Sequence, residues 1–248
     1  MRLLMCYFFW GGFVVHANAT EFAKDKPSAL KNGHATIQMG GYWRTSASQQ
    51  FIQFDGLIGD KFTVTHAANS NGLFGVGYFV TGQERDYYNV QYGLNWFYLP
   101  KTNISGTVIK EGSYENLTYG YHVTQYPFYA IVKSTIKTIF SEQRITLNAG
   151  IGPNFIQTSH FDEYSILNDD SEYTLPDNIF SGKTTTQFSA TLGAGIQFNH
   201  AFGQVPLECG YQFYYLGQGK MRIINDQVLN PLKTGTLYAN AVMCSITI

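Results

Sequence analysis

The sequence predicts an all-β protein, a transmembrane antiparallel up-and-down β-barrel, and three observations lead to this prediction. Segments of about ten residues alternate between apolar and small or polar side chains along most of the chain. Charged residues make up 13% of the sequence, about half the ~25% of a soluble domain, whereas aromatic residues reach 16%. After residue 19, no apolar run approaches the ~20 residues that a transmembrane helix needs.

The N-terminal segment has the pattern of a secretory signal peptide. Arg2 supplies a positive charge, Leu3 to Val15 supply an apolar core, and residues 17–19 form an A-x-A cleavage sequence. We therefore expect residues 1–19 to be removed during export. Residues 20–248 would then form a single barrel domain outside the cytoplasm.

The charge balance of the mature chain limits its partners. Without Arg2, 15 Lys and Arg residues remain against 17 Asp and Glu residues, a net charge of −2. Nucleic-acid binding requires a basic stripe or patch, and the sequence shows none. No nucleic acid is therefore predicted as a partner.

The residues that occupy each face of the strands distinguish a membrane barrel from a soluble sandwich. In QFSATLGAGIQF, residues 187–198, one face is apolar throughout, whereas the other carries Ser189, Thr191, Gly193 and Gly195. The polar face of a soluble sandwich would carry many charged residues, because water covers it. Small uncharged residues instead suit a narrow enclosed lumen, and aromatic residues at the strand ends suit interfacial girdles. The glycines match no phosphate-binding motif, and we expect them to make room in the lumen for larger side chains such as Tyr42, Tyr214 or Gln212.

Eight strands follow from the alternation and the connections. They are predicted near residues 34–45, 72–81, 87–99, 117–139, 145–157, 184–199, 207–218 and 236–248. The short connections 83–86, 140–143 and 201–206 suit periplasmic turns, and the long polar connections 46–71, 100–116, 158–183 and 219–235 suit extracellular loops. A ten-stranded barrel is the alternative, because residues 50–66 have strand character and Pro127 marks a bulge or a hairpin tip within the fourth segment.

A polar network is predicted inside the lumen. A Lys on the lipid face near the membrane centre costs ~2–4 kcal/mol, so Lys133 and Lys137 should point inward. Glu208 has the inward parity of its own strand, and Arg144 and Gln212 complete the candidate set. A buried network of this kind is weak evidence for stability by itself. We favour structural filling of the lumen over a gate.

Two cysteines of the mature chain, Cys209 and Cys244, have the lipid-facing parity on the last two strands. Both lie near the periplasmic ends of these strands, where oxidising conditions permit a disulfide. Before any stagger, an antiparallel register places residue 209 near residue 246 and residue 211 near residue 244. A bridge and two free thiols are both compatible with this arrangement.

No catalytic residue, cofactor or metal ligand is predicted. The histidines of the mature chain are scattered, and none lies in H-E-x-x-H or H-x-S; they are His34, His66, His122, His160 and His200. The third long loop is rich in carboxylates, which are ligands that hard cations prefer; they are Asp162, Glu163, Asp169, Asp170, Glu172 and Asp177. Their spacing does not match a calcium loop, and a solvated acidic loop is the favoured interpretation.

The chain resembles the small Gram-negative outer-membrane β-barrels of the OmpA, OmpX and opacity-protein type. The residues that carry this resemblance are the signal sequence, the glycine-bearing strands NAGIGPNF and SATLGAGIQF, and the alternating strand that ends the chain. In that family the last strand usually ends in an aromatic residue, whereas here it ends in Ile248. The resemblance implies residence in the outer membrane, contact with lipopolysaccharide and insertion by the barrel-assembly machinery.

Three functions are compatible with this fold. The first is a structural scaffold whose loops contact a host surface, lipopolysaccharide or envelope partners. The second is a narrow porin-like channel, and the third, less favoured, is a lipid-modifying enzyme. Because an eight-stranded lumen is just wide enough to be filled by side chains, we favour the scaffold.

Overall fold

The structure is a computed structural model, and it describes residues 6–9, 12–15, 33–45, 48–65, 69–138, 143–166, 174–202 and 205–248. The chain divides into two units, Met1–Gly33 and His34–Ile248, which are described separately. In the first unit, β1 (Cys6–Phe9) and β2 (Gly12–Val15) form an antiparallel pair. The predicted cleavage sequence at residues 17–19 lies outside the described residues, and the signal peptide stays a prediction.

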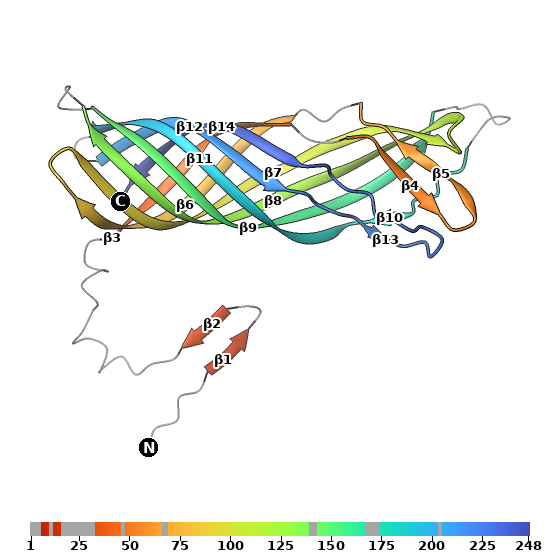
Figure 1. Ribbon diagram of the computed structural model, residues 1–248, viewed down its shortest axis with the longest axis horizontal. Helices are drawn as coiled ribbons and strands as arrows, with labels where there is room; N and C mark the ends of the chain where they lie inside the picture. Colours follow the sequence, from red (N-terminus) through yellow and green to blue (C-terminus); the bar gives the residue numbers. More distant parts are fainter. Residues whose placement is uncertain are drawn as a thin grey trace, which may run out of the picture. The chain divides into compact units, whose positions relative to one another are not determined.

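Eight long strands of the second unit form a closed ring (Figure 1). Each strand pairs with the strands before and after it among these eight, and β14 pairs with β3 to close the ring. The eight-stranded up-and-down barrel predicted from the sequence is therefore confirmed. In chain order the strands are β3 (Gly33–Thr45), β6 (Asn69–Glu84), β7 (Tyr88–Lys110), β8 (Tyr114–Lys137), β9 (Gln143–Ser165), β11 (Lys183–Phe202), β12 (Val205–Gly217) and β14 (Leu237–Thr247).

The two faces of the strands lie as the alternation predicts. On β11, Phe188 is 61% exposed and faces outward, whereas its neighbour Ser189 is 0% exposed and faces the lumen. A Cβ atom at Gly193 would collide with the side chain of Gln212, and one at Gly75 would collide with the ring of Phe97. The absence of a side chain at these two positions therefore leaves space that larger side chains from neighbouring strands occupy.

An apolar belt surrounds the barrel. Its outward side chains run from Tyr88 to Tyr98 on β7, from Tyr126 to Ile136 on β8 and from Phe188 to Phe198 on β11. About ten residues at ~3.3 Å per residue, tilted by ~45°, cover the ~25 Å apolar band of an outer-membrane barrel. No helix of the described residues is long and apolar enough to cross a membrane.

Aromatic rings border the belt on the side away from the C-terminal end of β14. Ring centroids lie 5.5–6.4 Å apart in four contacts between these rings. Three pairs join neighbouring strands, namely Tyr98–Tyr126, Phe188–Tyr215 and Phe213–Tyr238, and the pair Trp43–Tyr211 spans β14. The short connections lie at the end where β3 begins and β14 ends, and the long connections lie at the opposite end. By the arrangement of outer-membrane barrels, these are the periplasmic and extracellular ends.

The sheet continues beyond the belt, which corrects the predicted loops. The connection predicted as loop 100–116 belongs mostly to β7 and β8, and β9 extends to Ser165 within the predicted loop 158–183. A register shift between Leu99 and Thr102 reverses the parity of β7, so that apolar residues beyond it turn inward. The outward residues there are polar because they meet water, and the segment therefore looks like a loop when one parity is assumed throughout.

Short strands cover the extracellular end of the ring (Figure 1). Within the predicted loop 46–71, β4 (Gln50–Phe54) and β5 (Leu57–Phe62) form a hairpin that pairs with the outer part of β7. β10 (Phe180–Ser181) and β13 (Arg222–Ile223) form a second small sheet. We call residues 48–65, 101–124, 157–166, 174–182 and 218–236 the headpiece.

The alternative of ten strands is wrong for the ring, although the strand character of residues 50–66 is real. β4 and β5 join the main sheet but lie outside the closed ring of eight. Pro127 lies inside β8 opposite Asn154 and is not a hairpin tip. The extra strands therefore enlarge the headpiece and leave the width of the barrel unchanged.

Candidate functional site

The periplasmic half of the lumen contains a buried ion pair. Lys133 on β8 is 7% exposed, and its Nζ binds Glu208 Oε2 on β12. Thr146 Oγ1 on β9 donates a hydrogen bond of 2.6 Å to the other carboxylate oxygen of Glu208. Both oxygens of this carboxylate therefore have partners.

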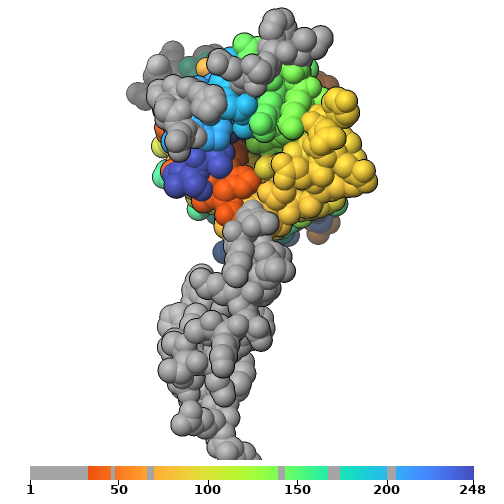
Figure 2. Space-filling model, turned by 90° about the vertical axis from the view of Figure 1, so that its left-hand side faces the viewer, coloured from red at the N-terminus to blue at the C-terminus, as the bar shows by residue number. Residues whose placement is uncertain are grey.

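A small polar cavity lies next to this ion pair. Gln212 on β12 donates to Asn148 Oδ1 at 2.8 Å and to Thr191 Oγ1, and it lines the cavity together with Lys133 and Glu208. The cavity has a volume of about 40 Å³, which is room for a few water molecules and not for a larger solute. Figure 2 views this end of the barrel and shows the strands around a central hollow.

The structure brings three residues of the predicted network together and places the other two elsewhere. Lys133, Glu208 and Gln212 line the same cavity. Lys137 and Arg144 lie opposite each other on β8 and β9 at the periplasmic rim, where Lys137 is exposed. Two like charges at a wet rim are solvated by water, so their position there is physically reasonable.

Aromatic rings cross the lumen above the cavity. Phe97, Tyr129 and Tyr214 contact one another with ring centroids 5.5–6.2 Å apart, although they come from β7, β8 and β12. The hydroxyl group of Tyr129 hydrogen-bonds with that of Ser189. This layer separates the polar cavity from the extracellular half of the lumen.

The extracellular half of the lumen and the headpiece share one apolar core, which we call the plug. Its members come from both the ring and the headpiece and are fully buried; they include Ile52, Leu99, Ile104, Leu117, Ile156 and Leu216. Farther out, Phe62, Tyr119, Phe161 and Phe180 pack with ring centroids 5.1–6.2 Å apart. The sequence analysis predicted a polar lumen and missed the plug. Ile52 and Ile104 lie in segments that were assigned to loops. The others lie at the ends of predicted strands, on the face that was expected to be polar; they are Leu99, Leu117, Ile156 and Leu216.

Arg44 is a buried cation without a partner among the described residues. It is 1% exposed and faces the lumen from β3, and none of its three guanidinium nitrogens has a hydrogen-bond partner there. Its electrostatic neighbours are the phenol groups of Tyr42 and Tyr121. Tyr42 itself donates a 2.8 Å hydrogen bond to the carbonyl oxygen of Pro100. An uncompensated buried charge is costly, so Arg44 marks a weak point in the packing.

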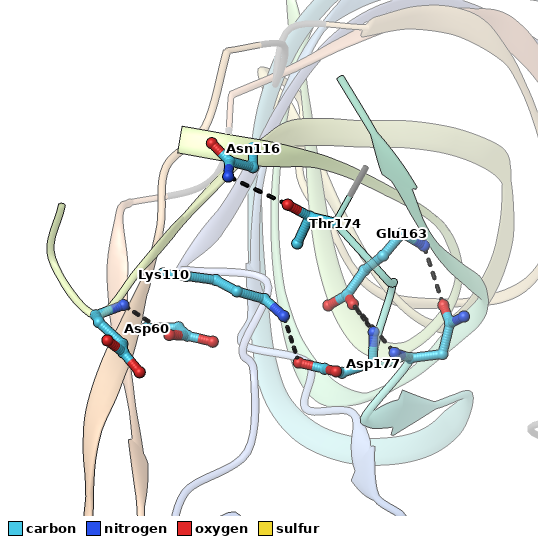
Figure 3. Close-up of polar contacts among 8 residues, drawn as sticks. Asp60, Lys110, Asn116, Glu163, Thr174 and Asp177 are labelled. Carbon is cyan, nitrogen blue, oxygen red and sulfur yellow. Dashed lines mark hydrogen bonds and ion pairs between the residues drawn. The ribbon is translucent and has the colours of Figure 1, made fainter. Parts of the chain in front are cut away.

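Polar contacts fasten the outer edge of the headpiece (Figure 3). Lys110 Nζ lies 2.8 Å from Asp177 Oδ2, and Asp60 Oδ1 accepts a 3.1 Å hydrogen bond from the backbone N–H of Glu111. Asp60 is 7% exposed, and burial raises the pKa of its carboxyl group. These contacts tie β5 and the segment around residue 177 to the turn between β7 and β8.

A second carboxylate holds the segment that precedes β10. Glu163 Oε2 accepts hydrogen bonds from the backbone N–H groups of Asp177 and Asn178, at 2.9 and 3.0 Å. Asn116 Nδ2 donates a 3.1 Å hydrogen bond to Thr174 Oγ1, which lies earlier in the same segment (Figure 3). Burial raises the pKa of the Glu163 carboxyl group. Of the predicted acidic loop, residues 169, 170 and 172 lie outside the described part.

Two histidines that the sequence analysis regarded as scattered lie side by side on the outer wall. The rings of His122 on β8 and His160 on β9 have centroids 5.2 Å apart. Pairing of adjacent strands brings them together, and no local sequence signal could have shown it. His34 stacks on Phe79, whereas the side chains of His66 and His200 lie outside the described residues. No group of three His, Cys, Asp or Glu residues in the described part could hold a metal ion.

Cys209 and Cys244 lie directly opposite each other on β12 and β14, and their sulfur atoms form a disulfide. The register expected before stagger, with residue 209 near residue 246, is therefore wrong by two positions. Strands of a closed barrel are staggered, and a slip of two residues keeps every side chain on its own face. The stagger could not be deduced from the two strands alone.

No protein-family model matches the sequence, and no curated protein matches it. Solved structures that match the chain include two named as outer-membrane proteins and one named as a surface protein. OprG from Pseudomonas aeruginosa is 14% identical with a TM-score of 0.47, and 87% of this chain and 96% of that chain are covered. Neisserial surface protein A is 10% identical with a TM-score of 0.42, and the match covers 86% of this chain and 96% of that chain. The outer-membrane protease OmpT from Escherichia coli is 8% identical with a TM-score of 0.41, and the match covers 87% of this chain and 94% of that chain.

These proteins include a surface protein and a protease, so no activity follows from the comparisons. The architecture rests on the chain itself: a closed ring of eight strands, an apolar outer belt and a bordering row of aromatic rings. The chain is therefore an integral outer-membrane β-barrel protein of the small, eight-stranded class.

Proposed function

We propose that the protein is a closed surface scaffold, in which the barrel anchors the headpiece and conducts no solute. The plug is the observation that carries this proposal. Leu99, Ile156 and Leu216 are fully buried in the lumen and continue into the core of the headpiece. A solute would have to displace this core, and interiors of this kind are packed as densely as organic crystals.

The exposed face of the headpiece supports a role in contact with partners. Phe51, Leu57 and Ile58 on the β4–β5 hairpin are apolar and exposed, as is Leu229 on the neighbouring segment. The backbone N–H of Leu229 donates to the carbonyl oxygen of Gln53, which holds this segment against β4. Exposed apolar side chains that gather outside a membrane are typical of interaction sites. Lipopolysaccharide, envelope proteins and host surfaces are the partners within reach of this face.

Planar-bilayer recording tests the closed scaffold. The refolded full-length chain should give no steady conductance, and neither should the variant Glu208→Gln, because the plug lies above the ion pair and remains in place. Steady conductance of the unmodified chain would replace this proposal with a narrow porin-like channel. Conductance of Glu208→Gln alone would show that the ion pair, and not the plug, closes the lumen.

We also propose that the protein does not modify lipids. We propose in addition that the barrel-assembly machinery inserts it into the membrane. Outer membranes from cells with and without the protein should contain the same lipid A and phospholipid species. A protein-dependent change in either lipid would assign an enzyme. Depletion of the assembly machinery should leave the chain unfolded, which heat-modifiable mobility on gels would detect.

A further inference from the structure

We propose that His122 and His160 bind a divalent transition-metal ion on the outer wall of the headpiece. The two rings lie beyond the aromatic row that includes Tyr126, and therefore outside the apolar belt. Neither the scaffold role nor the plug requires these two residues. Metal binding by these histidines can therefore be tested independently of the proposed function.

The separation of the rings suits two imidazoles on one metal ion. Their centroids are 5.2 Å apart and their planes are inclined by 47°. A zinc–nitrogen bond is ~2.0–2.1 Å long, and a ring nitrogen lies about 1.1 Å from its centroid, so two imidazoles at a tetrahedral angle have centroids about 5 Å apart. The distance between the two rings therefore suits one metal ion bound by both imidazoles.

A local distortion of β9 brings His160 to this position. The register of β8 and β9 shifts between Gly120 and His122, where His122 pairs with Ser159. His160, the next residue, has a φ of 51°, in the left-handed region that non-glycine residues rarely adopt. A bulge of this kind redirects a side chain, and strained backbone is often found at functional sites.

His122 also has an unsatisfied nitrogen. Its Nδ1 atom is buried and has no hydrogen-bond partner among the described residues. An unpaired buried nitrogen costs free energy, which a metal ion bound to its lone pair would remove. Imidazole suits Zn²⁺, Ni²⁺ and Cu²⁺, and the usual order of affinities places Cu²⁺ above Zn²⁺.

The charged neighbours modify the affinity in opposite directions. The carboxylate of Asp162 is close enough to attract a cation near His122, whereas the ammonium of Lys101 repels it. Two protein ligands leave the remaining coordination positions to water. We therefore expect binding that is weaker than that of a structural zinc site with four protein ligands.

Isothermal titration calorimetry of the untagged, refolded full-length chain tests the proposal with CuCl₂ and ZnCl₂ in buffer without chelator. One ion per chain should bind, and Cu²⁺ should bind more tightly than Zn²⁺. His122→Gln and His160→Gln should each weaken binding at least tenfold. The matched control His34→Gln changes a histidine at the other end of the barrel and should bind as the unmodified chain does.

Each variant is first checked for folding by heat-modifiable gel mobility, so that loss of binding cannot come from loss of the barrel. Absence of binding heat, or binding that survives both His122→Gln and His160→Gln, would overturn the proposal. Titration with inorganic phosphate tests whether His122, His160 and Lys101 bind an anion instead of a metal ion. Phosphate binding that Lys101→Met abolishes, without metal binding, would assign an anion site instead.

Discussion

Lys133 and Glu208 form an ion pair across the lumen, although their strands, β8 and β12, are not neighbours in the ring. The pair therefore connects two parts of the wall that β9 and β11 separate, and β9 contributes the hydrogen bond from Thr146.

Lys133→Met should destabilise the barrel by about 3 kcal/mol, because it leaves the buried carboxylate of Glu208 without its cation. The double variant Lys133→Met/Glu208→Gln should recover most of this loss, since it removes both charges. Unfolding by urea in lipid vesicles measures both changes. Lys137→Met at the exposed rim serves as the control and should change the stability by less than ~0.5 kcal/mol. Equal effects of Lys133→Met and Lys137→Met would contradict a special role for the ion pair.

Arg44→Met should leave the barrel at least as stable as the unmodified chain, with a gain of about 1 kcal/mol or more. The substitution replaces a buried, unpaired guanidinium group with an apolar side chain of similar length. The same unfolding measurement applies, with Arg144→Met at the rim as the control. A loss of several kcal/mol would instead show that Arg44 has a partner, such as a bound anion or ordered water.

Because Cys209 and Cys244 form a disulfide, the number of free thiols should depend on reduction. Alkylation of the denatured mature protein should label no cysteine before reduction and two after it, namely Cys209 and Cys244. A third labelled thiol would be Cys6, and it would mean that the signal sequence has not been removed. Serine at both positions should cost about 4 kcal/mol, because the bridge closes a segment with a sequence separation of 35 residues. Two free thiols before reduction would contradict the bridge.

The headpiece should become more stable as the pH falls from neutral. Burial raises the pKa of Asp60, so the folded state holds this proton more tightly than the unfolded state, whose pKa is near 3.8. Stability is then lowest above the raised pKa and increases as the pH falls through it toward 3.8. The neighbouring charges are those of Lys110, Asp177 and Glu111.

Asp60→Asn should therefore slow amide hydrogen exchange in residues 48–65 at pH 7 and remove part of the pH dependence. Asp226→Asn changes an exposed carboxylate and should have no such effect. Faster exchange in Asp60→Asn at pH 7 would show that the charged carboxylate stabilises the headpiece, contrary to this account.

The faces of the membrane strands could be predicted because lipid and lumen impose opposite demands on alternate residues. Phe188 and Ser189 follow this rule, as does Gly193 beside Gln212. Strand number followed from the same alternation together with the short periplasmic turns. Each of these inferences needs only the period of two within one segment.

The headpiece could not be predicted in this way, because distortions of the strands reverse the parity. Beyond the register shift after Leu99 the inward set of β7 changes, and beyond His160 the inward set of β9 changes as well. The neighbours of Lys133 and of His122 depend on the stagger between strands, which the sequence of a single strand does not contain. The sequence placed Lys133 and Glu208 in one inward network, but their pairing, the plug and the two adjacent histidines emerge only from the assembled ring.

The bridge between Cys209 and Cys244 also affects how the protein would withstand attack from outside the cell. The two cysteines lie in the periplasmic half of β12 and β14, whereas the chain between them passes through residues 218–236 at the extracellular end. This part of the headpiece therefore belongs to a covalently closed circle. A protease that cuts a bond there would leave both fragments joined, and the cut molecule would separate only after reduction.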